Sequence, residues 1–158
     1  MNRVIAIDGP AGSGKSTVAK RVGRALGFLH VDSGALYRIM TWQTLLAGID
    51  TADAAAVAAC AERTEVDFSA EGGAVVFRVG GKVPGEAIRT AEINRHASPV
   101  ARVPAVRARV TAWLRALRPL GALIVEGRDI TSVVFPDSPA RFYLDAAPEV
   151  RALRRHRE

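Results

Sequence analysis

Cysteine is almost absent from the sequence, since Cys60 is the only one among 158 residues. A single cysteine cannot close an internal disulfide, so the chain falls outside the small disulfide-stapled secreted class, and a reducing cytoplasmic compartment fits best. Cys60 lies in an alanine-rich stretch without a charged partner nearby. We interpret it as a small buried apolar residue rather than a nucleophile.

Long apolar runs are missing too, because no stretch approaches the roughly 18 apolar residues of a membrane-spanning helix. The apolar segment at 4–7 is too short for a signal peptide and leads directly into a structural motif. Aromatic residues make up only 6% of the chain, and they do not alternate with basic residues as in a surface for single-stranded nucleic acid. We therefore expect neither a membrane nor a nucleic acid as a partner.

Lysine is scarce, because three lysines stand against 19 arginines, and the net charge is +6. A basic chain favours anionic partners, and the guanidinium group suits bidentate contacts with phosphate. Arginine enrichment also arises from genome composition alone, so the charge agrees with a phosphate ligand without establishing one. Apolar residues, at 49%, suffice for a folded domain with a core.

Apolar strand patterns alternating with helical patterns predict an α/β fold, a parallel sheet with helices on both faces. The predicted strands are 4–7, 28–31, 122–125 and 141–144, and the predicted helices are 16–26, 35–47, 52–63, 90–103, 104–117 and one from 148 onward. Short strands at 65–68, 74–79 and 81–83 predict a small antiparallel unit off one end of the sheet. The predicted organisation is a core over 1–63, an insertion over 64–103 and a continuation of the core over 104–158.

One motif predicts a phosphate site, because it follows the first predicted strand and opens the first predicted helix. Its residues match the pattern G-x-x-x-x-G-K-[ST] and are Gly9, Pro10, Ala11, Gly12, Ser13, Gly14, Lys15 and Ser16, followed by Thr17. Glycines let backbone N–H groups surround phosphate oxygens, and the positive end of the helix adds to the attraction. Lys15 would reach the β- and γ-phosphates of ATP, and the Ser16 hydroxyl would hold Mg²⁺.

Charged residues follow the predicted strands at the points where the strands end. Asp8 precedes the phosphate loop, Arg38 lies about one turn into the helix that follows the second strand, and Glu126, Arg128 and Asp129 follow the next sheet strand. The carboxyl ends of parallel strands meet at one edge of a sheet, so we expect these groups to converge there. Glu126 would support Mg²⁺ through water, while Arg38 and Arg128 suit a phosphate monoester. Asp8 either organises the loop or the water shell of the metal, or it is a turn residue.

Five segments spread along the chain are informative together: Ile7-Asp8-Gly9-Pro10 with the phosphate loop, Asp32-Ser33-Gly34-Ala35-Leu36-Tyr37-Arg38, Ile88-Arg89-Thr90, Gly127-Arg128-Asp129 and Val133-Val134-Phe135-Pro136-Asp137. In their order and spacing they resemble the bacterial cytidylate kinase family over essentially the whole chain. The phosphate loop alone is generic. The resemblance implies a P-loop nucleoside monophosphate kinase that moves the γ-phosphate of ATP to CMP or dCMP, and we expect a cytoplasmic monomer.

The resemblance also implies roles for single residues. Arg38 and Arg128 would clamp the acceptor phosphate and, with Lys15, form the catalytic set. The residues that would surround the acceptor nucleotide are Ser33, Tyr37, Ser98, Arg107 and Asp129. A carboxylate such as Asp129 accepts a hydrogen bond from the cytosine N4 amino group and repels the carbonyl of uracil. The segment 64–103, which contains Arg89, would be the enlarged segment that binds the nucleoside monophosphate.

Two departures from the family pattern stand out. The family commonly has Gly-Thr where this sequence has Thr131-Ser132, directly after Ile130. The sequence also ends at Glu158, where family members continue through the rest of a mobile lid, so we expect a fragment or a further tail. The last four arginines are expected either to begin that lid or to form a basic solvated face; they are Arg151, Arg154, Arg155 and Arg157.

Three other functions remain open at this point. Another small-molecule P-loop kinase, such as an adenylate or shikimate kinase, is disfavoured by Tyr37-Arg38 and by the β-rich insertion. A nucleotide-dependent regulatory or nucleic-acid-binding module is suggested by the isoelectric point near 10.4. A non-enzymatic structural domain would require a phosphate loop that binds no ATP.

Overall fold

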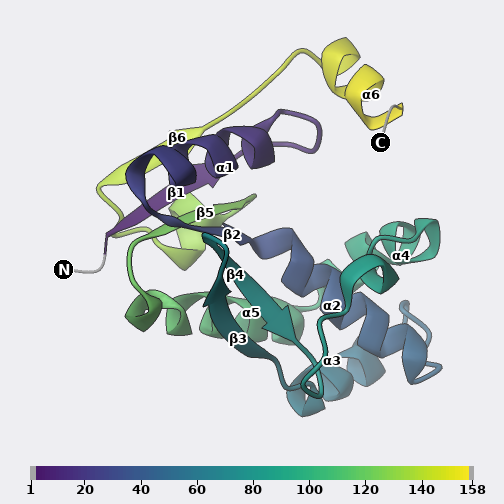
Figure 1. Ribbon diagram of the computed structural model, residues 1–158. Coiled ribbons are helices and arrows are strands. Elements are labelled where there is room, and N and C mark those ends of the chain that lie inside the picture. The colour runs from purple at the N-terminus through teal and green to yellow at the C-terminus, as the bar shows by residue number, and fades with distance from the viewer. Residues whose placement is uncertain (1–2, 157–158) are drawn as a thin grey trace. The chain divides into compact units, whose positions relative to one another are not determined.

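The computed structural model describes residues 3–156, and for Arg155 the backbone alone. The described chain forms one six-stranded sheet in the order β3-β4-β2-β5-β1-β6 (Figure 1). Five strands run parallel, namely β1 (Val4–Asp8), β2 (Leu29–Asp32), β4 (Ala74–Arg78), β5 (Leu123–Gly127) and β6 (Ala140–Tyr143). The α-helices are α1 (Lys15–Leu26), α2 (Ser33–Leu46), α3 (Ala54–Arg63), α4 (Ala91–Arg102), α5 (Pro104–Ala116) and α6 (Pro148–His156). The α/β class predicted from the sequence is therefore confirmed.

The chain divides into two compact units. The first consists of Met1–Asp32, Ala70–Val75 and Leu117–Glu158, and it carries β1, β2, β5 and β6 with α1 and α6. The second consists of Ser33–Ser69 and Val76–Ala116, and it carries α2, α3, α4 and α5. The predicted division at residues 64 and 103 concerns function and stays a prediction. None of the helices within residues 3–156 has the length and apolar character that a membrane crossing requires.

Helix α1 packs against β1, β2 and β5 (Figure 1). Its buried Ala19 joins Ile7, Phe28 and Ile124 in one apolar cluster. Gly23 permits this close approach, because a Cβ there would lie 3.0 Å from the Phe28 carbonyl oxygen. The helix ends at Gly27, whose φ of 68° is the left-handed conformation that glycine adopts without steric cost. The core of the first unit therefore holds α1, and the loop before it, against the sheet.

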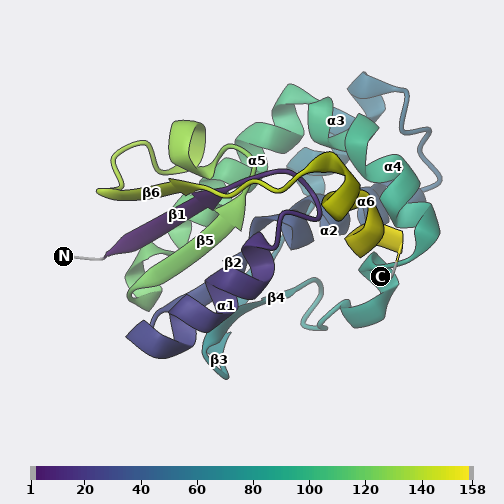
Figure 2. The same ribbon diagram turned by 90° about the horizontal axis from the view of Figure 1, so that it is seen from above.

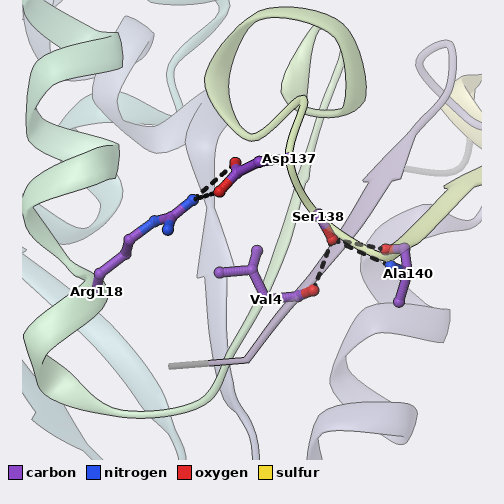
Figure 3. Close-up of polar contacts among 5 residues, drawn as sticks. All are labelled: Val4, Arg118, Asp137, Ser138 and Ala140. Carbon is purple, nitrogen blue, oxygen red and sulfur yellow. Dashed lines mark hydrogen bonds and ion pairs between the residues drawn. The ribbon is translucent and has the colours of Figure 1, made fainter. Parts of the chain in front are cut away.

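The start of β6 is fastened to β1 by a buried serine. The Ser138 hydroxyl donates to the Val4 carbonyl oxygen at 2.7 Å and also contacts Ala140 (Figure 3). Just before it, Asp137 accepts two hydrogen bonds from Arg118, at 2.7 and 2.8 Å, in an exposed ion pair. Exposed pairs of this kind contribute little to stability, so the buried serine contact is the stronger tie.

The second unit is a helical cluster in which α2 contacts α3, α4 and α5, and α5 contacts α3 and α4. Two of its helices have capping side chains, since Asp53 accepts from the Ala56 N–H at 3.0 Å and Thr90 from the Ile93 N–H at 3.2 Å. A buried threonine, Thr51, is hydrogen-bonded to Nδ1 of His96 at 2.8 Å. Cys60 is buried and free, which confirms its predicted place in the core.

Two of the three predicted short strands form side by side, but the prediction that they make a separate unit off one end of the sheet is wrong. Strands β3 (Asp67–Glu71) and β4 (Ala74–Arg78) extend the main sheet, and Ala74 pairs in parallel with His30 of β2. The predicted third strand at 81–83 is also wrong, because only an isolated bridge joins Val79 and Lys82. Two successive glycines at 80 and 81 have positive φ and turn the chain sharply, and a 3-10 helix, η1 (Gly85–Ile88), follows.

Three further differences concern short segments. The predicted link at 32–34 does not exist, since β2 runs to Asp32 and α2 begins at Ser33. A 3-10 turn, η2 (Arg118–Leu120), precedes β5. The segment after β5 forms one turn of π-helix, η3 (Ile130–Val134), where the sequence pattern predicted no helix. This turn matters for the site, because it follows Arg128 and Asp129 directly.

Candidate functional site

The loop between β1 and α1 has the backbone that the sequence motif predicts. Gly12 and Gly14 have φ of 76° and 90°, values that favour glycine over any residue with a Cβ. Gly9 is needed for another reason, because a Cβ there would lie 2.1 Å from the Leu144 carbonyl oxygen. The Gly9 N–H donates to the Gly127 carbonyl oxygen at 3.2 Å, which fixes the start of the loop beside the end of β5.

Two side chains of the loop carry hydrogen-bonding groups suited to an anion. Nζ of Lys15 lies 3.2 Å from the Pro10 carbonyl oxygen, so the ammonium group curls over its own loop. The Ser13 hydroxyl is buried and has no hydrogen-bond partner within the described residues. A buried hydroxyl without a partner is costly, and phosphate oxygens beside the loop would satisfy it. The chemistry of the loop thus fits a phosphate ligand.

Directly beside this loop, Ser16, Glu126 and His30 form a continuous hydrogen-bonded chain. The Ser16 hydroxyl donates to Oε2 of Glu126 at 2.6 Å. The other carboxylate oxygen of Glu126, Oε1, lies 2.8 Å from Nε2 of His30. Glu126 and His30 are both buried, with 2% and 8% of their surfaces exposed. The structure therefore brings together the two residues predicted to hold a metal, and it adds a histidine that the sequence did not single out.

Asp8 fastens the segment that follows β5. Its buried carboxylate accepts hydrogen bonds from the N–H groups of Ile130 and Thr131, at 2.8 and 2.9 Å, and from the Thr131 hydroxyl. This contact was not among the roles predicted for Asp8, and those roles stay predictions. The carboxylate holds the first turn of η3, and Arg128 and Asp129 lie immediately before that turn.

Arg128 and Asp129 stand at the same sheet edge as the phosphate loop, because Gly127 at the end of β5 pairs with Asp8 at the end of β1. Arg128 is exposed and Asp129 partly exposed. Both are therefore accessible to a ligand at that edge, as the sequence predicted, although their individual roles stay predictions.

Helix α6 lies beside the phosphate loop (Figure 2). The Arg154 guanidinium donates to the Gly12 carbonyl oxygen at 3.0 Å, and a Cβ at Gly12 would lie 2.9 Å from the Arg151 carbonyl oxygen. One of the arginines predicted either to begin a lid or to form a solvated face thus contacts the loop itself. Arg157 and the side chain of Arg155 lie outside the described residues.

The remaining predicted residues belong to the second unit. Tyr37 and Arg38 lie on α2, partly buried, and Ser33 is the buried first residue of that helix. Ser98 lies on α4 and Arg107 on α5, both exposed. Since α2, α4 and α5 contact one another, these side chains come from a single packed cluster of helices. Their placement relative to the phosphate loop stays a prediction.

A dedicated protein cage for a metal is not present in the described residues, because they contain no group of three or more His, Cys, Asp or Glu side chains that could hold an ion. Ser16 and Glu126 offer a hydroxyl and a carboxylate, the hard oxygen donors that suit Mg²⁺. A Mg²⁺ ion there would take its other ligands from phosphates and water.

Sequence reasoning missed two residues of this region. His30 lies between the apolar Leu29 and Val31, where no local pattern marks it as part of a site, and Thr131 replaces a residue of the resembled family. A buried histidine one strand away from Glu126 is a detectable signal only once the order of the strands is known, because His30 pairs with Ile124 two residues before Glu126.

Comparison with known proteins gives a consistent result. A family model described as cytidylate kinase matches residues 5–158. A cytidylate kinase of Pelotomaculum thermopropionicum is 46% identical over 156 residues, which cover 98% of this chain and 69% of that protein. A cytidylate kinase of Mycobacterium leprae is 43% identical over 97% of this chain and 67% of its own length. A bifunctional pantoate ligase/cytidylate kinase of Synechococcus is 44% identical over 98% of this chain and 32% of its own length.

Proposed function

Because the chain belongs to the cytidylate kinase family, we propose that it transfers the γ-phosphate of ATP to CMP or dCMP, giving CDP or dCDP. The observation that carries the proposal is the Ser16–Glu126 hydrogen bond beside a glycine loop with a buried, unpartnered hydroxyl. A loop that only turned the chain would need neither feature. The proposal includes ATP and the two cytidylates as partners of a cytoplasmic monomer.

The phosphate loop would bind ATP through its backbone N–H groups and the N-terminus of α1. Lys15 would turn its ammonium group from the Pro10 carbonyl oxygen to the β- and γ-phosphates, since the present contact is a 3.2 Å hydrogen bond within the loop. The Ser13 hydroxyl would gain the partner that it lacks. Once Lys15 has turned to the bound nucleotide, these groups would be in place before the transfer step and would stabilise charge on the transferred group.

Ser16 and Glu126 would hold Mg²⁺, Ser16 through its hydroxyl oxygen and Glu126 through water. While the Ser16 oxygen faces the ion, its proton can keep donating to Glu126, so the 2.6 Å hydrogen bond and the metal contact are compatible. When bound, Mg²⁺ neutralises charge that develops on the transferring phosphate. The two oxygens fit this ion because it needs few protein ligands beside those of a nucleotide.

On the acceptor side, Arg38 and Arg128 would clamp the phosphate of the monophosphate through bidentate hydrogen bonds. Asp129 would accept from the cytosine N4 amino group, with Ser33, Tyr37, Ser98 and Arg107 completing the surroundings of the nucleotide. No strong general base is required, because the acceptor phosphate is already an anionic nucleophile. The work of these side chains is orientation and charge neutralisation.

A panel of acceptors tests the proposal against its alternatives. ADP formation from ATP is measured in a coupled assay with CMP, dCMP, UMP, AMP and shikimate, each at the same concentration. We expect the highest kcat/KM with CMP or dCMP. Preference for AMP or shikimate would assign another P-loop kinase, and salt-dependent binding of DNA or RNA without any acceptor activity would assign the nucleic-acid-binding alternative.

A further inference from the structure

His30 is a buried polar residue between the apolar Leu29 and Val31 of β2, and its side chain is hydrogen-bonded to Glu126. The two residues lie on neighbouring parallel strands, where His30 pairs with Ile124, so Glu126 stands two residues further along β5 on the same face. Nε2 of His30 and Oε1 of Glu126 are 2.8 Å apart. A carboxylate only accepts hydrogen bonds, so His30 is the donor.

The hydrogen bond from His30 fixes the orientation of the Glu126 carboxylate. A glutamate reaches its partners through three torsions, and the last of them has a broad, poorly defined preference. With Ser16 alone as its partner, the carboxylate would pivot about Oε2. The second hydrogen bond, from His30, fixes the plane of the carboxylate and satisfies Oε1, which is buried with the rest of the side chain.

We propose that His30 is a positioning residue for the metal site, holding the Glu126 carboxylate so that Oε2 stays on the Ser16 hydroxyl. The inference rests on the proposed function, because it assigns His30 to the same Ser16–Glu126 pair that would hold Mg²⁺. Histidine here acts through Glu126 and touches neither nucleotide nor ion. Residues that orient metal-binding groups in this way typically contribute about 10- to 100-fold to metal affinity.

The test measures metal affinity directly rather than turnover. Mn²⁺, observed by electron paramagnetic resonance, replaces Mg²⁺, and its dissociation constant is determined in the complex of the protein with a non-hydrolysable β,γ-imido analogue of ATP. We expect His30→Leu to weaken Mn²⁺ binding by about tenfold, with the affinity for the metal-free analogue unchanged. His96→Leu is the matched control, because His96 makes a hydrogen bond of the same length, 2.8 Å, within the other unit.

Two amide variants keep the test decisive if the leucine variant fails to fold. The Gln side chain can place an N–H near the position of Nε2, whereas the Asn side chain is one carbon shorter. His30→Gln should therefore retain most of the Mn²⁺ affinity, and His30→Asn should lose about as much as the leucine variant. Equal affinities in the two amide variants would overturn the proposal.

A double-mutant cycle separates action through Glu126 from an independent effect. In a Glu126→Ala background, where residue 126 has no side-chain oxygen left to accept from His30, His30→Leu should cause no further loss of Mn²⁺ affinity, whereas additive losses would contradict the proposed role. Mn²⁺ binding by the wild-type protein separates a failure of the role of His30 from a failure of the proposed function. If wild type binds Mn²⁺ in the complex and His30→Leu binds it equally well, the role of His30 alone is wrong. If wild type binds no Mn²⁺ there, the proposed function falls and this role falls with it.

Discussion

The hydroxyl of Ser16 donates a 2.6 Å hydrogen bond to Oε2 of Glu126, across 110 residues of sequence. The contact joins the first turn of α1 to the buried strand β5, and so it connects the phosphate loop to the centre of the sheet. A serine that only began a helix would not need a buried carboxylate as its partner. The pair is the structural basis for the metal site that we propose.

Replacement of Lys15 by alanine should abolish turnover while the fold survives. The ammonium group would stabilise charge on the transferring phosphate, and removal of such a cationic group lowers kcat by about 10³-fold or more. The free energy of unfolding should change by less than about 1 kcal/mol, because the side chain lies in the loop and not in the core. Steady-state kinetics and urea unfolding check both expectations.

Lys20→Ala is the control for this variant, since Lys20 is an exposed lysine on the same helix. It should leave kcat unchanged. A Lys15→Ala protein with a rate close to that of wild type would remove Lys15 from the catalytic set.

Gly12→Ala should weaken ATP binding through backbone strain. The residue has a φ of 76°, and a Cβ would lie 2.9 Å from the Arg151 carbonyl oxygen of α6. Alanine in this conformation would create about 1–2 kcal/mol of strain, and the loop would change its shape to relieve it. We therefore expect the KM for ATP to rise by about tenfold. Gly27→Ala is a matched control, because its φ is 68° but nothing lies within 4 Å of an added Cβ. Gly27→Ala should lower the free energy of unfolding by about 1 kcal/mol and leave the KM for ATP unchanged. A raised KM in Gly27→Ala together with an unchanged KM in Gly12→Ala would contradict this explanation.

Asp8→Asn should both destabilise the protein and raise the KM for CMP. The buried carboxylate accepts from two N–H groups and a hydroxyl, whereas an amide offers one acceptor oxygen and a donor in place of the other. We expect the free energy of unfolding to fall by about 2–3 kcal/mol in urea titrations. The KM should rise because η3 would no longer hold Arg128 and Asp129.

Thr131→Val removes only the hydroxyl of this contact and should cost about 1 kcal/mol. Asp67→Asn, at an exposed carboxylate of β3, should cost almost nothing. An Asp8→Asn protein as stable as the Asp67 control would show that the carboxylate does not hold the segment after β5.

Asp129→Ala should relax the preference for cytosine over uracil. Loss of the acceptor for the N4 amino group, and of the repulsion against a carbonyl, should lower the ratio of kcat/KM for CMP to that for UMP by about tenfold. Asp137→Ala removes a carboxylate that is paired with Arg118 in an exposed position, and it should leave the ratio unchanged. An unchanged ratio in the Asp129 variant would place base recognition elsewhere.

Local chemistry explains what could be predicted from the sequence. Gly12 and Gly14 of the phosphate loop have positive φ, a conformation that favours glycine, and Gly27 ends α1 as expected from its conformational freedom. Apolar strands and helical spacing gave the α/β class, because burial patterns repeat over a few residues.

The remaining features depend on contacts between distant residues, which no local pattern reveals. Thr131 contacts Asp8 across 123 residues, and His30 contacts Glu126 across 96. The extension of the sheet by β4 rests on one pairing, His30 with Ala74, so the glycine-rich segment resembled a separate unit. Each of these features follows from the order of strands, which becomes known only with the fold.

The transfer of ³²P from γ-labelled ATP to CMP is the decisive measurement of the proposed reaction. We expect the label to appear in CDP, at a rate that depends on the CMP concentration and on divalent metal, and we expect Lys15→Ala to form no labelled CDP. Binding of ATP without transfer of label to any cytidylate, or release of the label only as inorganic phosphate, would rule out a cytidylate kinase.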